Sequence, residues 1–145
     1  MIRIALADDH AQMREIWKLI LSRNPAYEVV VSCSSGKEAI AAAADFSPDV
    51  FLMDINMQPV SGIEATAIIA KMCPSVKVIG MSIHKEGIYV RRMLEAGAHG
   101  YVTKNSSYEE ILHAIEEVQS GMRYICKEVQ EYMSEWFTTA MAPVR

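Results

Sequence analysis

The sequence lacks the features that identify membrane proteins, nucleic-acid-binding proteins and disulfide-rich proteins. No apolar run approaches the roughly 18 to 20 residues that a membrane-spanning helix needs. Lysine and arginine number 14 against 18 aspartates and glutamates, so the net charge of −4 provides no basic field that attracts nucleic acid. The three cysteines have no CxxC spacing and are expected to be buried apolar residues of a cytoplasmic protein.

One further absence limits the classes of ligand that the protein is expected to bind. None of the seven glycines belongs to a GxGxxG motif, which argues against a nucleotide or flavin site. The turn Asp8-Asp9-His10 is acidic, and it would repel a phosphate group in the absence of a metal. What is present is a chain of 145 residues with 51% hydrophobic content, which suits one globular domain with a sizeable core.

Short apolar runs alternate with helical patterns along the chain. Strands are predicted at 2–7, 27–32, 50–53, 76–81 and 100–103. Helices are predicted around 13–21, at 37–44, 62–72 and 86–95, and between Ser107 and Gly121. Gly97 is well placed to end the fourth helix, and Ser107 with Glu110 three residues on can form a capping box for the fifth. In the first helix the apolar face is Met13, Ile16, Trp17, Ile20 and Leu21. Alternation of this kind predicts a doubly wound α/β domain, with helices on both faces of a parallel sheet.

The apolar run at 50–53 ends in Asp54 and organises the predicted site. Ligands bind at the carboxyl ends of the strands in open parallel sheets. The polar residues after strands one, three, four and five are, in that order, Asp8 and Asp9, Asp54, Ser82, and Lys104. Taken singly, each has an ordinary explanation as a helix cap, a loop hydroxyl or a solvated charge. Their joint order along one sheet edge indicates function.

The chemistry of this set favours phosphoryl transfer. Crowded carboxylates repel one another unless a cation offsets them, and hard oxygen ligands suit Mg²⁺. A lysine and a hydroxyl on the same edge can neutralise and orient phosphoryl oxygens. An aspartate can itself accept the phosphoryl group as an aspartyl phosphate. The set therefore predicts metal-assisted phosphoryl transfer onto Asp54.

About residues 1–121 resemble the receiver domain of two-component response regulators. The resemblance rests on Asp8-Asp9, on the segment 53–57 with Gly62 beyond it, on Met81-Ser82 and on the segment 100–104. It implies a flavodoxin-like fold with a five-stranded parallel sheet of order 2-1-3-4-5 and five helices. It also implies a sensor histidine kinase or a phosphotransfer protein as the phosphoryl donor. Such a domain is not an enzyme in the usual sense, since it catalyses only its own phosphorylation and dephosphorylation.

The resemblance assigns roles to individual residues. Asp9, Asp54 and the main-chain carbonyl of Asn56 would bind Mg²⁺ or Mn²⁺ directly, and Asp8 would act through water. Ser82 and Lys104 would contact the phosphoryl group. Tyr101 matches the aromatic switch position. Inward motion of Ser82 and a rotamer change of Tyr101 would then remodel the face formed by helix four, strand five and helix five.

One position departs from the pattern of this family. Proline is usual four residues after the acceptor, where this chain has Gln58 followed by Pro59. The loop over the site is therefore expected to differ in shape, with effects on donor access and on the lifetime of the phosphoryl group. Asn56 and His84 stand where such domains tune dephosphorylation, although a loop histidine is more often only solvated.

The pattern changes after Gly121, and residues 122–145 are predicted to be a linker and a helical tail. An extra amphipathic helix is expected from the stripe Val129, Tyr132, Met133, Trp136, Phe137 and Ala140. It either folds back on its own domain or serves as a linker or homodimer helix that relays the switch. The segment 115–125 resembles receivers that carry a C-terminal LuxR-type helix-turn-helix.

No DNA-binding domain is predicted in this sequence. Residues 126–145 hold too few elements for one, and Lys127 and Arg145 are their only basic residues. The chain is then either the receiver of a transcription regulator that binds DNA through a domain absent here, or a stand-alone receiver that acts by protein contact. A scaffold that is never phosphorylated is disfavoured, because the acids, the hydroxyl and the lysine are all present.

An enzyme of the haloacid dehalogenase type is the main alternative class. Those phosphatases use an Asp-x-Asp motif whose second acid donates a proton. Here the second position is Asn56, which cannot act as a carboxylic acid. An enzyme of this type also needs cap segments, for which 145 residues leave little room.

Overall fold

Six parallel strands alternate with six helices in the structure, a computed structural model that describes the backbone of residues 1–141 and the side chains of residues 1–134. The strands are β1 (Ile2–Ala7), β2 (Tyr27–Cys33), β3 (Val50–Asp54), β4 (Lys77–Ser82), β5 (Gly100–Thr103) and β6 (Tyr124–Ile125). The helices are α1 (Ala11–Ser22), α2 (Gly36–Phe46), α3 (Gly62–Met72), α4 (Gly87–Ala96), α5 (Tyr108–Gln119) and α6 (Lys127–Met141).

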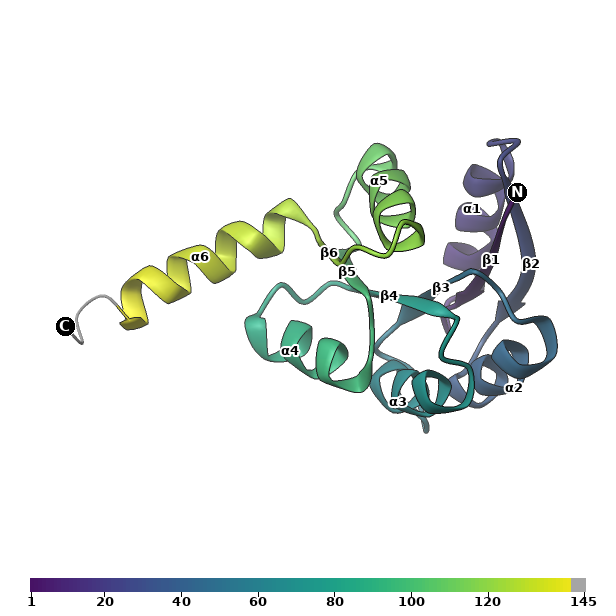
Figure 1. The fold of residues 1–145 in the computed structure, drawn as a ribbon, viewed down its shortest axis with the longest axis horizontal. Coiled ribbons are helices and arrows are strands. Elements are labelled where there is room, and N and C mark those ends of the chain that lie inside the picture. Colours follow the sequence, from purple (N-terminus) through teal and green to yellow (C-terminus); the bar gives the residue numbers. More distant parts are fainter. Residues whose placement is uncertain (142–145) are drawn as a thin grey trace.

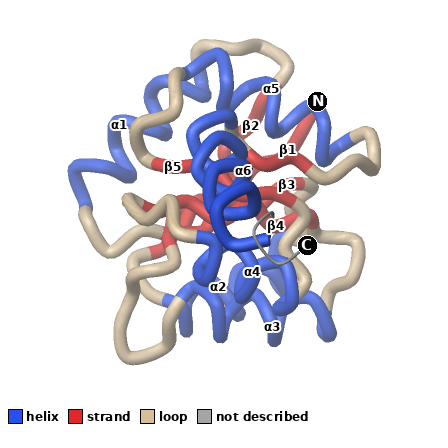
Figure 2. The backbone as a smooth tube through the Cα atoms, turned by 90° about the vertical axis from the view of Figure 1, so that its left-hand side faces the viewer, coloured by secondary structure: helices blue, strands red, loops and turns tan. Residues whose placement is uncertain are grey.

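The strand order is β2-β1-β3-β4-β5-β6, which confirms the predicted order 2-1-3-4-5 and the flavodoxin-like doubly wound fold. Helices α1 and α5 cover one face of the sheet, and α2, α3 and α4 cover the other (Figures 1 and 2). Strand β6 was not predicted. It has two residues, which are too few to show a period, and it pairs in parallel with β5.

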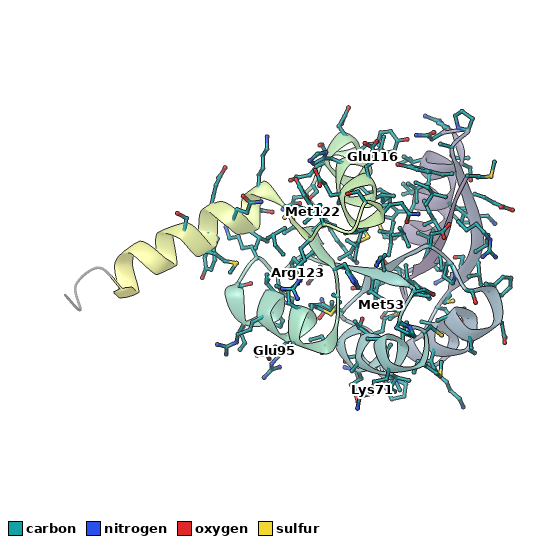
Figure 3. All side chains as sticks on the ribbon, in the orientation of Figure 1. Met53, Lys71, Glu95, Glu116, Met122 and Arg123 are labelled. Atoms are coloured by element: carbon teal, nitrogen blue, oxygen red, sulfur yellow. The ribbon has the colours of Figure 1, made fainter. Side chains whose placement is uncertain are left out.

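The core lies on both sides of β3. All five residues of this strand are buried, as expected for a central strand with helices on each face. In Figure 3, Met53 lies between the layers, whereas Lys71 and Glu95 lie on the outer surface. Within residues 1–141 no helix is long and apolar enough to cross a lipid bilayer.

Local capping sets the ends of several helices. The Ser61 side chain accepts from the Glu64 N–H, and the Glu64 carboxylate accepts from the Ser61 N–H, so a complete capping box starts α3. Gly97 ends α4 with a φ of 112°, as predicted from the glycine at this position. A capping box was also predicted for Ser107 and Glu110, and only half of it forms: Ser107 accepts from the Glu110 N–H.

Two other details differ from the predictions. Ile16 was placed on the buried face of α1 but is 50% exposed, and Leu21 alone is fully buried in that helix. Of the predicted stripe on α6, Val129 is buried and Met133 packs against the core. The side chains of Trp136, Phe137 and Ala140 lie outside the described residues.

Candidate functional site

The carboxyl ends of β1, β3, β4 and β5 meet at one edge of the sheet. The strand register pairs Ala7 with Met53, Asp54 with Met81, and Ser82 with Thr103. This alignment brings together the side chains that follow each strand. Lys104 is tied to the same edge, because its N–H donates to the Ser82 carbonyl at 2.9 Å.

Four potential metal-ligating side chains lie within 4.8 Å of one another: Asp8, Asp9, His10 and Asp54. Asp8 and Asp54 are 5% and 2% exposed, whereas Asp9 and His10 are exposed. The His10 Nδ1 atom lies 3.1 Å from Asp8 Oδ1 and 3.0 Å from Asp9 Oδ1. His10 was not predicted as a site residue, although its position directly after the acidic pair was the available signal.

Lys104 is the cation that faces these acids. Its Nζ lies 3.2 Å from Asp8 Oδ2 and 3.5 Å from Asp54 Oδ2. Burial acts to raise the pKa of Asp8, but the His10 N–H and the Lys104 charge outweigh it, so the pKa lies below its usual value. Burial raises the pKa of Asp54 above its usual value, because the Asn56 N–H and the Lys104 charge offset only part of the desolvation.

Asp54 carries an unsatisfied oxygen. Its Oδ1 accepts from the Asn56 N–H at 3.1 Å, whereas its buried Oδ2 has no hydrogen-bond partner among the described residues. A buried charged acceptor without a hydrogen-bond donor is costly, and here Lys104 pairs with both Asp8 and Asp54. The oxygen-rich donor set and this orphan atom fit a hard divalent cation.

The backbone behind Asp54 depends on Gly62. A Cβ at this position would collide with the main-chain oxygen of Asp54 and would lie 2.6 Å from the Cα of Ile55. The Gly62 N–H donates to the Ile55 carbonyl at 3.1 Å. Glycine is therefore required for the close approach that holds the end of β3 in place.

Ser82, His84 and Tyr101 form a second group beside the acids. Ser82 is fully buried, and its Oγ accepts from the His84 N–H at 3.0 Å and lies 3.4 Å from Asn56 Nδ2. Tyr101 is also fully buried, and its hydroxyl donates to the His84 carbonyl at 2.6 Å. The His84 ring stacks on Tyr89 with centroids 4.1 Å apart.

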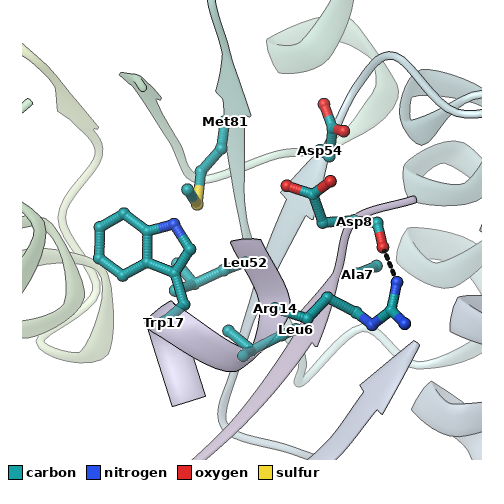
Figure 4. A pocket seen from close by; sticks show the side chains of 8 residues that line it. All are labelled: Leu6, Ala7, Asp8, Arg14, Trp17, Leu52, Asp54 and Met81. Atoms are coloured by element: carbon teal, nitrogen blue, oxygen red, sulfur yellow. Dashed lines mark hydrogen bonds between the residues drawn. The ribbon is translucent and has the colours of Figure 1, made fainter. Parts of the chain in front are cut away.

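A small open cleft adjoins the acids (Figure 4). Asp8 and Asp54 lie at one end of it, and Trp17 and Met81 line the other. The Arg14 Nη1 atom donates to the main-chain oxygen of Asp8 at 2.7 Å, which fixes the turn after β1.

The structure thus brings the predicted residues Asp8, Asp9, Asp54, Ser82 and Lys104 to one edge. Asn56 and Gln58 are exposed in the loop after β3. In the described part of the chain no hydrogen bond joins Gln58 to the other site residues.

The comparisons with known proteins agree on one family. Residues 4–116 match the response regulator receiver domain. The chain is 40% identical over 128 residues to the transcriptional regulatory protein DegU of Brevibacillus brevis, and the aligned region covers 88% of this chain and 54% of DegU. It is 35% identical over 134 residues to the response regulator UvrY of Escherichia coli (strain K12), and this aligned region covers 92% of this chain and 62% of UvrY. The chain therefore spans less than two thirds of the length of these relatives.

A solved structure is also similar over nearly its whole length. It is a two-component response regulator of the LuxR family from Aurantimonas sp. SI85-9A1. The TM-score is 0.89 at 32% identity, and the match covers 93% of this chain and 96% of that one.

Proposed function

Because the chain belongs to the response regulator receiver domain family of two-component systems, we propose that Asp54 is its phospho-acceptor. The donor would be a phosphohistidine on a sensor histidine kinase or phosphotransfer protein. The observation that carries this proposal is the buried Asp54 Oδ2 atom, which has no hydrogen-bond partner among the described residues and faces Lys104 at 3.5 Å. An acceptor oxygen that is not already hydrogen-bonded is available to attack phosphorus.

Asp54 would act as the nucleophile. One of its oxygens forms a bond to phosphorus while the phosphorus–nitrogen bond of the donor breaks, and the electron pair of that bond goes to the imidazole nitrogen. Lys104 would pair with a phosphoryl oxygen, and the Ser82 hydroxyl would donate to another. Their present positions, joined through the Lys104 N–H and the Ser82 carbonyl, place both at the edge where Asp54 lies.

Asp9, Asp54 and the Asn56 carbonyl would hold Mg²⁺ or Mn²⁺, with Asp8 acting through water. The bound cation would neutralise negative charge that develops on the phosphoryl oxygens. The close approach of the acids supports this assignment, as does the hard oxygen character of the donor set.

The switch would pass through the buried group beside the acids. The Ser82 Oγ atom accepts from the His84 N–H, so movement of this atom toward a phosphoryl oxygen would lengthen or break that hydrogen bond. His84 in turn accepts from the Tyr101 hydroxyl. A change at Ser82 would therefore alter the loop that holds Tyr101.

We propose that the output is transcription, through a DNA-binding domain outside this sequence. The support is the similarity to DegU, whose name describes a transcriptional regulatory protein. Transcript profiling after replacement of Asp54 by Asn in the cell tests this point. Profiles that match those of the unaltered strain under inducing conditions would contradict it.

Intact-mass analysis after incubation with a small-molecule phosphodonor, with and without Mg²⁺, tests the acceptor. We expect one phosphoryl adduct that requires Mg²⁺ and that peptide mapping places on Asp54. Asp54→Asn should take no adduct, whereas Asp45→Asn, an exposed acid on α2, should behave as the parent protein. Full modification of Asp54→Asn would refute the assignment.

A further inference from the structure

Helix α6 is anchored to the domain by its first turn. Cys126, which precedes it, is fully buried, and its N–H donates to the Tyr101 carbonyl at 3.0 Å. The Glu110 carboxylate accepts from the Lys127 N–H at 2.8 Å and from the Tyr124 hydroxyl at 2.7 Å. Glu110 of α5 therefore caps α6 from another helix, and this explains why it does not complete its own capping box.

The first half of α6 then contacts the two segments that carry Ser82 and Lys104. From β5, the Thr103 hydroxyl donates to Glu128 Oε1 at 2.6 Å, and Thr103 is 1% exposed. From the β4–α4 side, the Lys85 Nζ atom lies 5.7 Å from the centre of the Tyr132 ring, and Met133 lies beside Gly87. Figures 1 and 2 show α6 at this end of the sheet, beside α4.

Thr103 connects the helix to the site. Thr103 is the last residue of β5 and contacts α6, whereas Lys104, the next residue along the chain, contacts the acids. The hydrogen bond to Glu128 has a carboxylate acceptor and a buried donor, and hydrogen bonds to carboxylates are among the stronger kinds. Any shift of the strand end that moves Lys104 also moves the Thr103 hydroxyl.

We propose that Glu128 is a positioning residue for Lys104, and that phosphorylation of Asp54 and docking of α6 on β5 stabilise each other. This inference rests on the proposed function. A phosphoryl group is more negative than the carboxylate it modifies, so it holds Lys104 more firmly and orders the end of β5. The ordered strand end presents Thr103 to Glu128, and the docked helix in turn keeps Lys104 in place. Coupling of this kind is reciprocal.

Cys126 offers a direct measure of docking. Because it is fully buried at the start of α6, its labelling by N-ethylmaleimide requires the helix to open locally. Peptide mass spectrometry resolves it from Cys73, which is partly exposed and serves as the reference, and from buried Cys33, which reports that the fold is intact. Labelling is measured with and without beryllium fluoride and Mg²⁺, which mimic the phosphorylated state.

The test compares Glu128→Ala and Thr103→Val with Thr103→Ser, which retains the hydroxyl. The control is Glu131→Gln, an exposed acid on the same helix. We expect Glu128→Ala and Thr103→Val to label at Cys126 about tenfold faster than the parent, and to bind beryllium fluoride about tenfold more weakly by fluorine NMR. Thr103→Ser and Glu131→Gln should resemble the parent. In the parent, beryllium fluoride should slow labelling of Cys126 by a similar factor.

The outcomes separate the two proposals. If the parent binds beryllium fluoride but labelling of Cys126 does not respond to it, the coupling is wrong and the phospho-acceptor assignment stands. Equal labelling in Glu128→Ala and Glu131→Gln also overturns the coupling. If the parent binds no beryllium fluoride and takes no phosphoryl group, the proposed function fails and the coupling fails with it.

Discussion

Replacing Lys104 by Met tests whether this lysine compensates the buried acids. Its ammonium lies 3.2 Å from Asp8 and 3.5 Å from Asp54, and its side chain is 16% exposed. At an effective dielectric constant of about 20, each attraction amounts to roughly 5 kcal/mol before desolvation is subtracted. Removing one partner of a buried ion pair leaves the other charge uncompensated, and we expect a loss of about 3 kcal/mol in the free energy of unfolding at pH 7. For a domain of this size the melting temperature should fall by roughly 10 °C.

The pH dependence of this loss follows from the signs of the pKa shifts. The pKa of Asp54 is raised by burial, so its ionised form destabilises the fold above that pKa, and stability is regained as the pH falls toward the unfolded value. The pKa of Asp8 is lowered although burial opposes this, with the His10 N–H and Lys104 outweighing it, so Asp8 contributes stability above its unfolded value. Without Lys104, the pKa values of both acids should rise. The difference between parent and Lys104→Met should therefore be largest at neutral pH and shrink toward pH 4.

Urea unfolding without metal, at pH 7 and near pH 4, measures this difference. The double variant Lys104→Met/Asp54→Asn is the matched control, because it removes one of the acids that Lys104 faces, and it should recover much of the stability lost in Lys104→Met. A Lys104→Met protein as stable as the parent at pH 7 would refute the view that these acids need a cation. A loss that does not change with pH would show that packing, and not charge, is responsible.

Two further predictions concern the scaffold of the site. Gly62→Ala should lower the free energy of unfolding by at least about 2 kcal/mol, because the added Cβ collides with the backbone at Asp54. Denaturant unfolding measures this loss, and an unchanged midpoint would contradict the close approach. Among the thiols, burial raises the pKa of Cys33 to about 11, so at pH 8 it should react with a disulfide reagent far more slowly than the half-buried Cys73. Peptide mapping measures the two reaction rates, and equal rates for Cys33 and Cys73 would argue against the burial of Cys33.

Much of the fold follows from local patterns in the sequence. Periods of two and 3.6 residues are properties of neighbouring side chains, so β5, α3 and most other elements could be predicted within a residue or two. The positions of Asp8, Asp54, Ser82 and Lys104 after their strands place them at one edge of a parallel sheet, and the structure brings them there. Local chemistry similarly predicted that Gly97 ends α4.

Other features depend on segments far apart in the chain. Strand β6 forms because the chain after α5 returns to pair with β5, and two residues are too few to show a pattern that predicts it. Glu110 was predicted to cap its own helix, but packing of α5 against the start of α6 turns it toward Lys127. Ile16 has the spacing of a buried residue, yet it is 50% exposed, because which residues of a helical face are covered depends on how α1 packs in the folded domain.

The sequence by itself therefore determined most of the elements, their order, and the acids, hydroxyl and lysine at the site, since each depends on near neighbours and on the geometry of parallel sheets. Only the tertiary structure decided the contacts of His10 with both acids, and the hydrogen bond from Thr103 to Glu128, 25 residues away. Such contacts depend on how completed elements pack, and distances between atoms on separate elements are not encoded in the periodicity of either one.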